Sequence, residues 1–131
     1  MPPPLKKILY VEDDLDIQIV ARMALQTVGG FTLEVCSSGR EAVEIAPMFV
    51  PDLVLLDVMM PQMDGPSTLR ALRELSVTKT TPTIFMTAKV MPSDVARYRE
   101  IGAVDVIAKP FDPMNLSLEI QNIWKRHHDG G

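Results

Sequence analysis

Five residues whose side chains could take part in chemistry each follow a short apolar run, although they are far apart along the chain. They are Glu12, Asp13, Asp57, Thr87 and Lys109. Each has an ordinary structural explanation when taken alone, since acidic residues often cap helices or follow strands and a lone lysine is usually a surface charge. If the fold brings all five together, however, they form a site with three carboxylates, a hydroxyl and an ammonium group.

Such a cluster of acidic groups indicates a cation. Two carboxylates about 4 Å apart repel each other by roughly 1 kcal/mol in water, and by several times more near a protein interior. Lys109 offsets one of the three negative charges, so a divalent ion would balance the other two. The candidate ligands are all oxygen atoms, which favours Mg²⁺ or Mn²⁺. A metal-bound Asp57 beside an ammonium and a hydroxyl suits phosphoryl transfer, with the carboxylate as nucleophile.

The elements that would position these residues can be read from the apolar pattern. Five apolar runs predict strands at residues 8–11, 32–36, 53–56, 83–86 and 104–107. Amphipathic segments between and after them predict five helices. The first predicted helix covers residues 17–28 and is ended by Gly29-Gly30, and the second begins at the capping-box residues 38–41. The third begins at Pro66, the fourth covers residues 93–101, and the fifth has Asp112 as its N-cap.

Strands and helices in alternation predict an α/β domain with a mainly parallel, doubly wound sheet. Ligands of such sheets bind outside the carboxyl ends of the strands, where the five polar residues lie. We expect a single domain at residues 7–126, preceded by a flexible segment at 1–6 and followed by a frayed tail at 127–131.

Length, charge and cysteine content exclude several classes of protein. A chain of 131 residues buries enough surface to fold without disulfides, and the single cysteine, Cys36, rules out an intramolecular one. The net charge of −4 argues against direct binding to nucleic acid. The most apolar stretch is interrupted by Asp57, and prolines stand where a signal peptide has its apolar core, so we expect a cytoplasmic protein with no membrane insertion.

Four motifs in this order resemble the response-regulator receiver domain of two-component signalling, in its chemotaxis-regulator-like, single-domain form. The resemblance covers about residues 7–125 and implies a flavodoxin-like fold with strand order 2-1-3-4-5. It also implies phosphorylation by a histidine kinase or a histidine phosphotransfer protein. The motifs are ILYVEDD at 8–14, PDLVLLDVMMPQMDG at 51–65, IFMTA at 84–88, and GA at 102–103 through KPF at 109–111.

The resemblance further implies a role for each matching residue. Output would pass to a downstream protein through the surface of the fourth helix, fifth strand and fifth helix, because the short tail leaves output to a partner. The implied site consists of the phosphoryl acceptor Asp57, the Mg²⁺ ligands Asp13, Asp57 and the Met59 backbone carbonyl, Glu12 acting through water, the phosphoryl contacts Thr87, the Ala88 backbone N–H and Lys109, and a cis bond before Pro110.

Three further positions concern the lifetime of the phosphoryl group and the response to it. The family often has Tyr or Phe three residues before the lysine, and this chain has Val106 there, so an aromatic rotamer switch is absent. Lys89 and Met59 occupy the two positions that modulate loss of the phosphoryl group.

Three other functions are alternatives to the phosphoryl-acceptor hypothesis. A scaffold with this fold and no phosphorylation would fail to bind Mg²⁺. A phosphohydrolase with an aspartate nucleophile needs a second acid near Asp57, where Met59 stands. A flavodoxin-type electron carrier needs a neutral phosphate loop after the first strand, whereas Glu12, Asp13 and Asp14 would repel a phosphate there.

Overall fold

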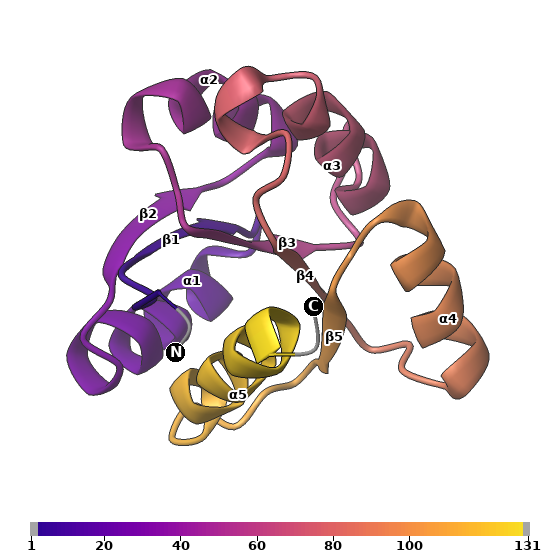
Figure 1. Cartoon of the computed structure of the whole chain (residues 1–131). Helices are drawn as coiled ribbons and strands as arrows, with labels where there is room; N and C mark the ends of the chain where they lie inside the picture. The colour runs from indigo at the N-terminus through magenta and orange to yellow at the C-terminus, as the bar shows by residue number, and fades with distance from the viewer. Residues whose placement is uncertain (1–2, 130–131) are drawn as a thin grey trace.

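The computed structural model describes residues 3–129. At its centre lies a five-stranded parallel sheet with the strand order β2-β1-β3-β4-β5 (Figure 1). Every strand lies within one residue of its predicted bounds, and both the doubly wound α/β class and the strand order are confirmed. The strands are β1 (Lys7–Val11), β2 (Thr32–Cys36), β3 (Leu53–Asp57), β4 (Thr83–Thr87) and β5 (Asp105–Ala108).

Helices cover both faces of this sheet (Figure 1). On one face lie α1 (Leu15–Arg22), its continuation η1 (Met23–Val28) and α5 (Leu116–Asp129). On the other lie α2 (Gly39–Phe49), α3 (Gly65–Arg73) and α4 (Pro92–Ile101), with the short turn η2 (Ser76–Thr78) before β4. Within residues 3–129, none of the helices combines the length and the apolar character needed to span a membrane.

The alternation of side chains along β3 explains why two layers of helices are needed. Leu53 and Leu55 pack into the core beneath α1 and α5, whereas Val54 and Leu56 pack into the core beneath α2, α3 and α4. Burying an aliphatic side chain of this size contributes roughly 1.5–3 kcal/mol. The strand that ends at Asp57 is therefore clamped from both sides, and its end is a rigid place for a functional group.

The first helix keeps its predicted glycine stop but changes its winding before it ends. The Gly29 N–H donates to the Ala24 carbonyl at 3.0 Å, five residues back, which is a π-helical bond. This wider turn rotates Val28 out to solvent, although the helical pattern includes it in the apolar face. Gly30 then takes a φ of 73°, in the left-handed region that favours glycine, and the chain turns into β2.

The regular part of the last helix begins later than predicted, although Asp112 makes the hydrogen bonds of the predicted N-cap. Asp112 Oδ1 accepts the Met114 N–H at 3.0 Å, and the Asp112 carbonyl accepts the N–H groups of Asn115 and Leu116, each at 3.0 Å. An aspartate that bonds the backbone two residues later stabilises a turn. Asp112 therefore closes a turn, and the regular helix begins at Leu116.

The N-terminal segment contacts the rest of the domain. Leu5 is buried, and the backbone N–H groups of Lys6 and Lys7 donate to Asp52 Oδ2 at 3.1 and 2.9 Å. These contacts connect the segment before β1 to the rest of the domain, and its flexibility stays a prediction. Residues 1 and 2 lie outside the described part of the chain.

The last helix extends into the segment for which a frayed tail is predicted. Helix α5 continues to Asp129, and the Trp124 indole N–H donates to the Pro3 carbonyl at 2.8 Å. His128 Nδ1 lies 2.8 Å from the Trp124 carbonyl. Residues 127–129 are helical, their fraying stays a prediction, and residues 130 and 131 lie outside the described ones.

The buried position of Cys36 leads to a first prediction. Its side chain is fully buried at the end of β2, and burial together with the carboxylates of Glu41 and Glu34 raises its pKa to about 12. Since the thiolate is the reactive form, we expect the native protein at neutral pH to react with a disulfide reagent more than about a hundredfold more slowly than the protein unfolded in guanidinium. The thiolate released by the reagent is followed by absorbance. Equal rates in the two states would contradict this burial.

Candidate functional site

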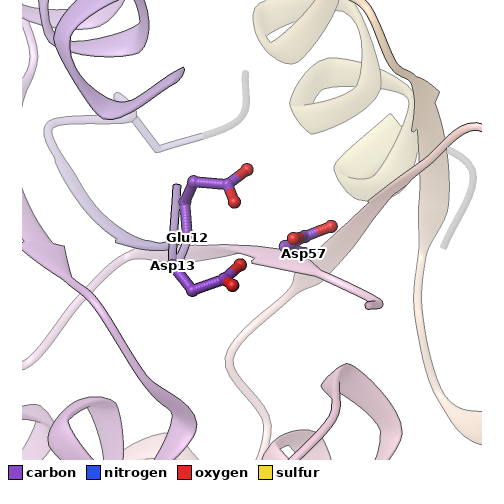
Figure 2. A group of neighbouring side chains, drawn as sticks. All are labelled: Glu12, Asp13 and Asp57. Atoms are coloured by element: carbon purple, nitrogen blue, oxygen red, sulfur yellow. The ribbon is translucent and has the colours of Figure 1, made fainter. Parts of the chain in front are cut away.

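The ends of four strands bring the five predicted residues to one edge of the sheet. Glu12 and Asp13 follow β1, Asp57 and Thr87 are the last residues of β3 and β4, and Lys109 follows β5. All five line one cavity of about 310 Å³. Figure 2 shows Glu12 and Asp13 leaving the end of β1 in different directions, with both carboxylates reaching to the side where Asp57 lies. The sequence prediction that these residues meet is confirmed.

Lys109 is the ionic link between two of the strand ends. Its Nζ lies 2.8 Å from Glu12 Oε1 and 3.2 Å from Asp57 Oδ1. Burial alone would lower the pKa of Lys109, but the hydrogen bond to Glu12 and the charge of Asp57 raise it above its ordinary value. The ammonium therefore stays charged and holds the two carboxylates on either side of it.

Glu12 is turned inward, with its side chain almost fully buried. Besides the Lys109 ammonium, Oε1 faces the Tyr10 hydroxyl at 3.4 Å, and Oε2 accepts the Asp14 N–H at 3.2 Å. Burial and the charge of Glu12 raise the pKa of Tyr10, so its phenol stays protonated and can donate. A buried carboxylate needs such partners, and here they orient Glu12 as well as solvate it.

Asp13 is the exposed member of the acidic group, and its surroundings fit a hard cation. Oxygen atoms of Glu12, Asp13 and Asp57 lie within 4.8 Å of one another. Loss of water around Asp13 and the neighbouring Glu12 raise the pKa of Asp13, because the like charges are not fully balanced by Lys109. Carboxylate oxygens with uncompensated negative charge are the kind of ligand that Mg²⁺ prefers in proteins. Met59 lines the same cavity, as the expected backbone ligand should.

The loop after Asp57 is folded back tightly over the strand end. The Gly65 N–H donates to the Val58 carbonyl at 2.9 Å. A Cβ on Gly65 would come within 2.7 Å of the Asp57 carbonyl oxygen and 2.8 Å of the Val58 Cα. These are backbone atoms that cannot move aside, so the close approach requires glycine. Gly65 thereby lets α3 start next to the Asp57 carboxylate.

Thr87 and the residues after it form the other side of the cavity. Thr87 is buried, and its Oγ1 accepts the Lys89 backbone N–H at 3.1 Å, which leaves the hydroxyl proton free to be donated. Ala88 lines the cavity beside it. The Lys89 side chain instead lines a neighbouring cavity of about 630 Å³ that also includes Met59 and Tyr98. The structure therefore places Lys89 next to the site, with its backbone holding Thr87.

Two further predicted positions lie outside the cavity. Val106 is half-buried and packs against the core beneath α2, α3 and α4. The Lys109–Pro110 peptide bond is cis, and Pro110 lines a small cavity with Ile17 and Phe111 on the α1 side.

Three residues that support the site, Tyr10, Gly65 and Gln18, are not predicted from the sequence to do so. Tyr10 and Gly65 are described above, and Gln18 on α1 donates through Nε2 to the Glu12 carbonyl at 2.5 Å and to Ser37 Oγ at 3.1 Å. Gln18 could have been noticed, since it is a polar residue next to the apolar stripe of its helix. Nothing in the local pattern distinguishes Tyr10 from an ordinary apolar strand residue.

Comparison with known proteins agrees with this geometry. Residues 8–121 match the family model described as the response regulator receiver domain. The chain is 37% identical over 124 residues to the transcriptional regulatory protein CpxR of Escherichia coli. The aligned region covers 95% of this chain and 51% of CpxR. It is 36% identical to the probable transcriptional regulator ycf27 of Cyanophora paradoxa, covering 92% of this chain and 49% of that one.

Solved structures show the same likeness. The chemotaxis response regulator CheY4 of Vibrio cholerae superposes with a TM-score of 0.83 at 31% identity, covering 92% of this chain and 99% of that one. A putative response regulator from Chloroflexus aurantiacus gives a TM-score of 0.82 at 31% identity, covering 94% and 100%. The chain spans about half the length of the curated relatives it matches. From the shared motifs, the fold and the converging strand ends, the chain belongs to the response regulator receiver domain family of two-component signalling.

Proposed function

We propose that this chain accepts a phosphoryl group on Asp57 from a phosphohistidine of a partner histidine kinase or histidine phosphotransfer protein, and that the phosphorylated state alters its binding to a downstream protein. The observation that carries the proposal is the position of Lys109, whose ammonium lies within 3.2 Å of Asp57 and 2.8 Å of Glu12 in one open cavity. An ammonium there can stabilise negative charge that arrives on the acceptor.

In the proposed transfer, an Asp57 carboxylate oxygen forms a bond to phosphorus while the phosphorus–nitrogen bond of the donor breaks. The imidazole leaves with the bonding electron pair and takes up a proton, and the product on Asp57 is an acyl phosphate. Lys109, the Thr87 hydroxyl and the Ala88 backbone N–H would then hold the phosphoryl oxygens. Thr87 is suited to this role because its proton is free in the structure.

The cation site belongs to the same proposal. Asp13, Asp57 and the Met59 carbonyl would hold Mg²⁺ or Mn²⁺, with Glu12 acting through water because its carboxylate already faces Lys109 and Tyr10. When bound, the cation supplies positive charge that neutralises phosphoryl oxygens. Lys89 and Val106 would modulate lifetime and response. We place the output surface on α4, β5 and α5, where α4 and β5 flank the strand that ends at Thr87.

A second prediction tests the acceptor. We expect Mg²⁺-dependent labelling of the wild-type protein by a small acyl phosphate or phosphoramidate, and loss of at least about 90% of the label in Asp57→Asn, because an amide is not a nucleophile towards phosphorus. Incorporated phosphate is measured by intact-protein mass spectrometry. The matched control is Asp16→Asn, which removes an exposed carboxylate of α1 and should label normally. Label that survives in Asp57→Asn refutes the acceptor assignment.

A third prediction tests the cation site through stability. Asp13→Asn removes one of three mutually repelling carboxylates, so without divalent ions we expect its melting temperature to rise by about 3–5 °C over the wild type. At a hundredfold excess of Mg²⁺ over its Kd, the wild type should gain about 2.7 kcal/mol of stability, and the variant far less. Both are measured by thermal unfolding with and without Mg²⁺. A wild-type protein that gains no stability from millimolar Mg²⁺ would favour the scaffold function.

A further inference from the structure

Gln18 is a buried amide that joins three parts of the chain near the acidic cluster. It lies on α1 and is 8% exposed. Its Nε2 donates to the Glu12 carbonyl at 2.5 Å and to Ser37 Oγ, just after β2, at 3.1 Å. A buried amide costs free energy unless it is hydrogen-bonded, and here both bonds are directed at the loops that follow strands β1 and β2.

The bond to Glu12 bears directly on Asp13. The Glu12 carbonyl belongs to the planar peptide unit that continues into the Asp13 nitrogen, so the orientation of this unit sets the direction in which the Asp13 side chain leaves the backbone. The preceding peptide is held as well, since the Glu12 N–H donates to the Cys36 carbonyl at 2.9 Å. Gln18 and Cys36 together fix the backbone on both sides of Glu12.

Packing alone does not explain a glutamine here. Ala21 and Leu25, which follow on the same helix, are fully buried and apolar. An apolar side chain at position 18 would continue this stripe, but it would leave the Glu12 carbonyl without the amide donor. The choice of glutamine is therefore tied to that carbonyl.

We propose that Gln18 is a positioning residue for the cation site: by holding the Glu12 carbonyl, it keeps Asp13 directed towards Asp57. The inference rests on the proposed function, because it concerns the same cation. The chain segment that carries Asp13 is then ordered before the ion arrives. The ion meets a preformed pair of carboxylates and does not have to order a mobile loop.

The first experiment measures Mg²⁺ affinity by titration calorimetry in the wild type and in Gln18→Met, which keeps the length of the side chain and removes the donor. Losing one hydrogen bond that orders a ligand should weaken Mg²⁺ binding about fivefold to tenfold. Gln26→Met is the matched control, since Gln26 is an exposed glutamine at the end of the same helical segment. Its Mg²⁺ affinity should stay within about twofold of the wild type.

A double-mutant cycle separates positioning from a purely structural role. If Gln18 acts through Asp13, then Gln18→Met in an Asp13→Asn background should change the Mg²⁺ affinity by less than about twofold, because the ligand it positions is gone. A purely structural role would lower the melting temperature of Gln18→Met and leave its Mg²⁺ affinity unchanged. That result, or equal losses of affinity in both backgrounds, overturns the proposal.

A measurement on the wild-type protein keeps the proposal testable if Gln18→Met does not fold. In nuclear magnetic resonance spectra, the Gln18 side-chain NH₂ signals should exchange slowly with water and shift on Mg²⁺ titration with the same midpoint as the Asp13 backbone signal. The Gln26 side-chain signals should do neither. Fast exchange and no shift at Gln18 in a protein that binds Mg²⁺ refute the positioning role, whereas a wild-type protein that binds no Mg²⁺ refutes the proposed function.

Discussion

The ionic contact of Lys109 with Glu12 and Asp57 is the interaction on which the rest of this site depends. It joins the ends of β1, β3 and β5 and gives two buried carboxylates a positive partner. Without that partner, two nearly buried negative charges at neighbouring strand ends would repel each other and would lack solvation. With it, one negative charge of the cluster is compensated and the others remain available. The site is therefore stable enough to fold and still electrostatically prepared for a cation.

The parallel sheet makes this contact possible because all five strands end at the same edge. The register pairs Val11 with Leu56 and Asp57 with Met86, so the polar residues that terminate the strands lie side by side. The two cores on either side of the sheet hold β3 and β4 in place, and both strands are buried over their full length. Functional groups on the ends of such strands are positioned by packing, while the loops around them remain exposed.

The core on the α4 side links β4, the strand that ends at Thr87, to a surface helix. Phe85, two residues before Thr87, packs edge-on against Tyr98 of α4 with ring centroids 5.4 Å apart and an interplanar angle of 90°. Val106 adjoins the same core. In this chain the aromatic residue that packs against β4 lies on α4, whereas the family often has an aromatic residue on β5. A displacement at the end of β4 would therefore meet a tightly packed contact with α4.

The sequence by itself determined the fold class, the positions of the strands and the residue types of the site, because periodicity and the polar residues that end apolar runs are local properties of the chain. The convergence of Asp13, Asp57 and Lys109 also followed from it, since parallel strands share one carboxyl edge. Only the tertiary structure decided that Glu12 turns inward to Lys109 and Tyr10, that Gln18 holds the Glu12 carbonyl, that Asp112 closes a turn before α5, and that the Trp124 indole N–H donates to the Pro3 carbonyl. The contacts of Lys109 with Glu12 and of Trp124 with Pro3 join residues that are far apart along the chain, and such long-range contacts leave no periodic trace in the sequence. The Asp112 turn is local, but an aspartate before a helical pattern can either close a turn or cap a helix, so residue type alone does not decide between them.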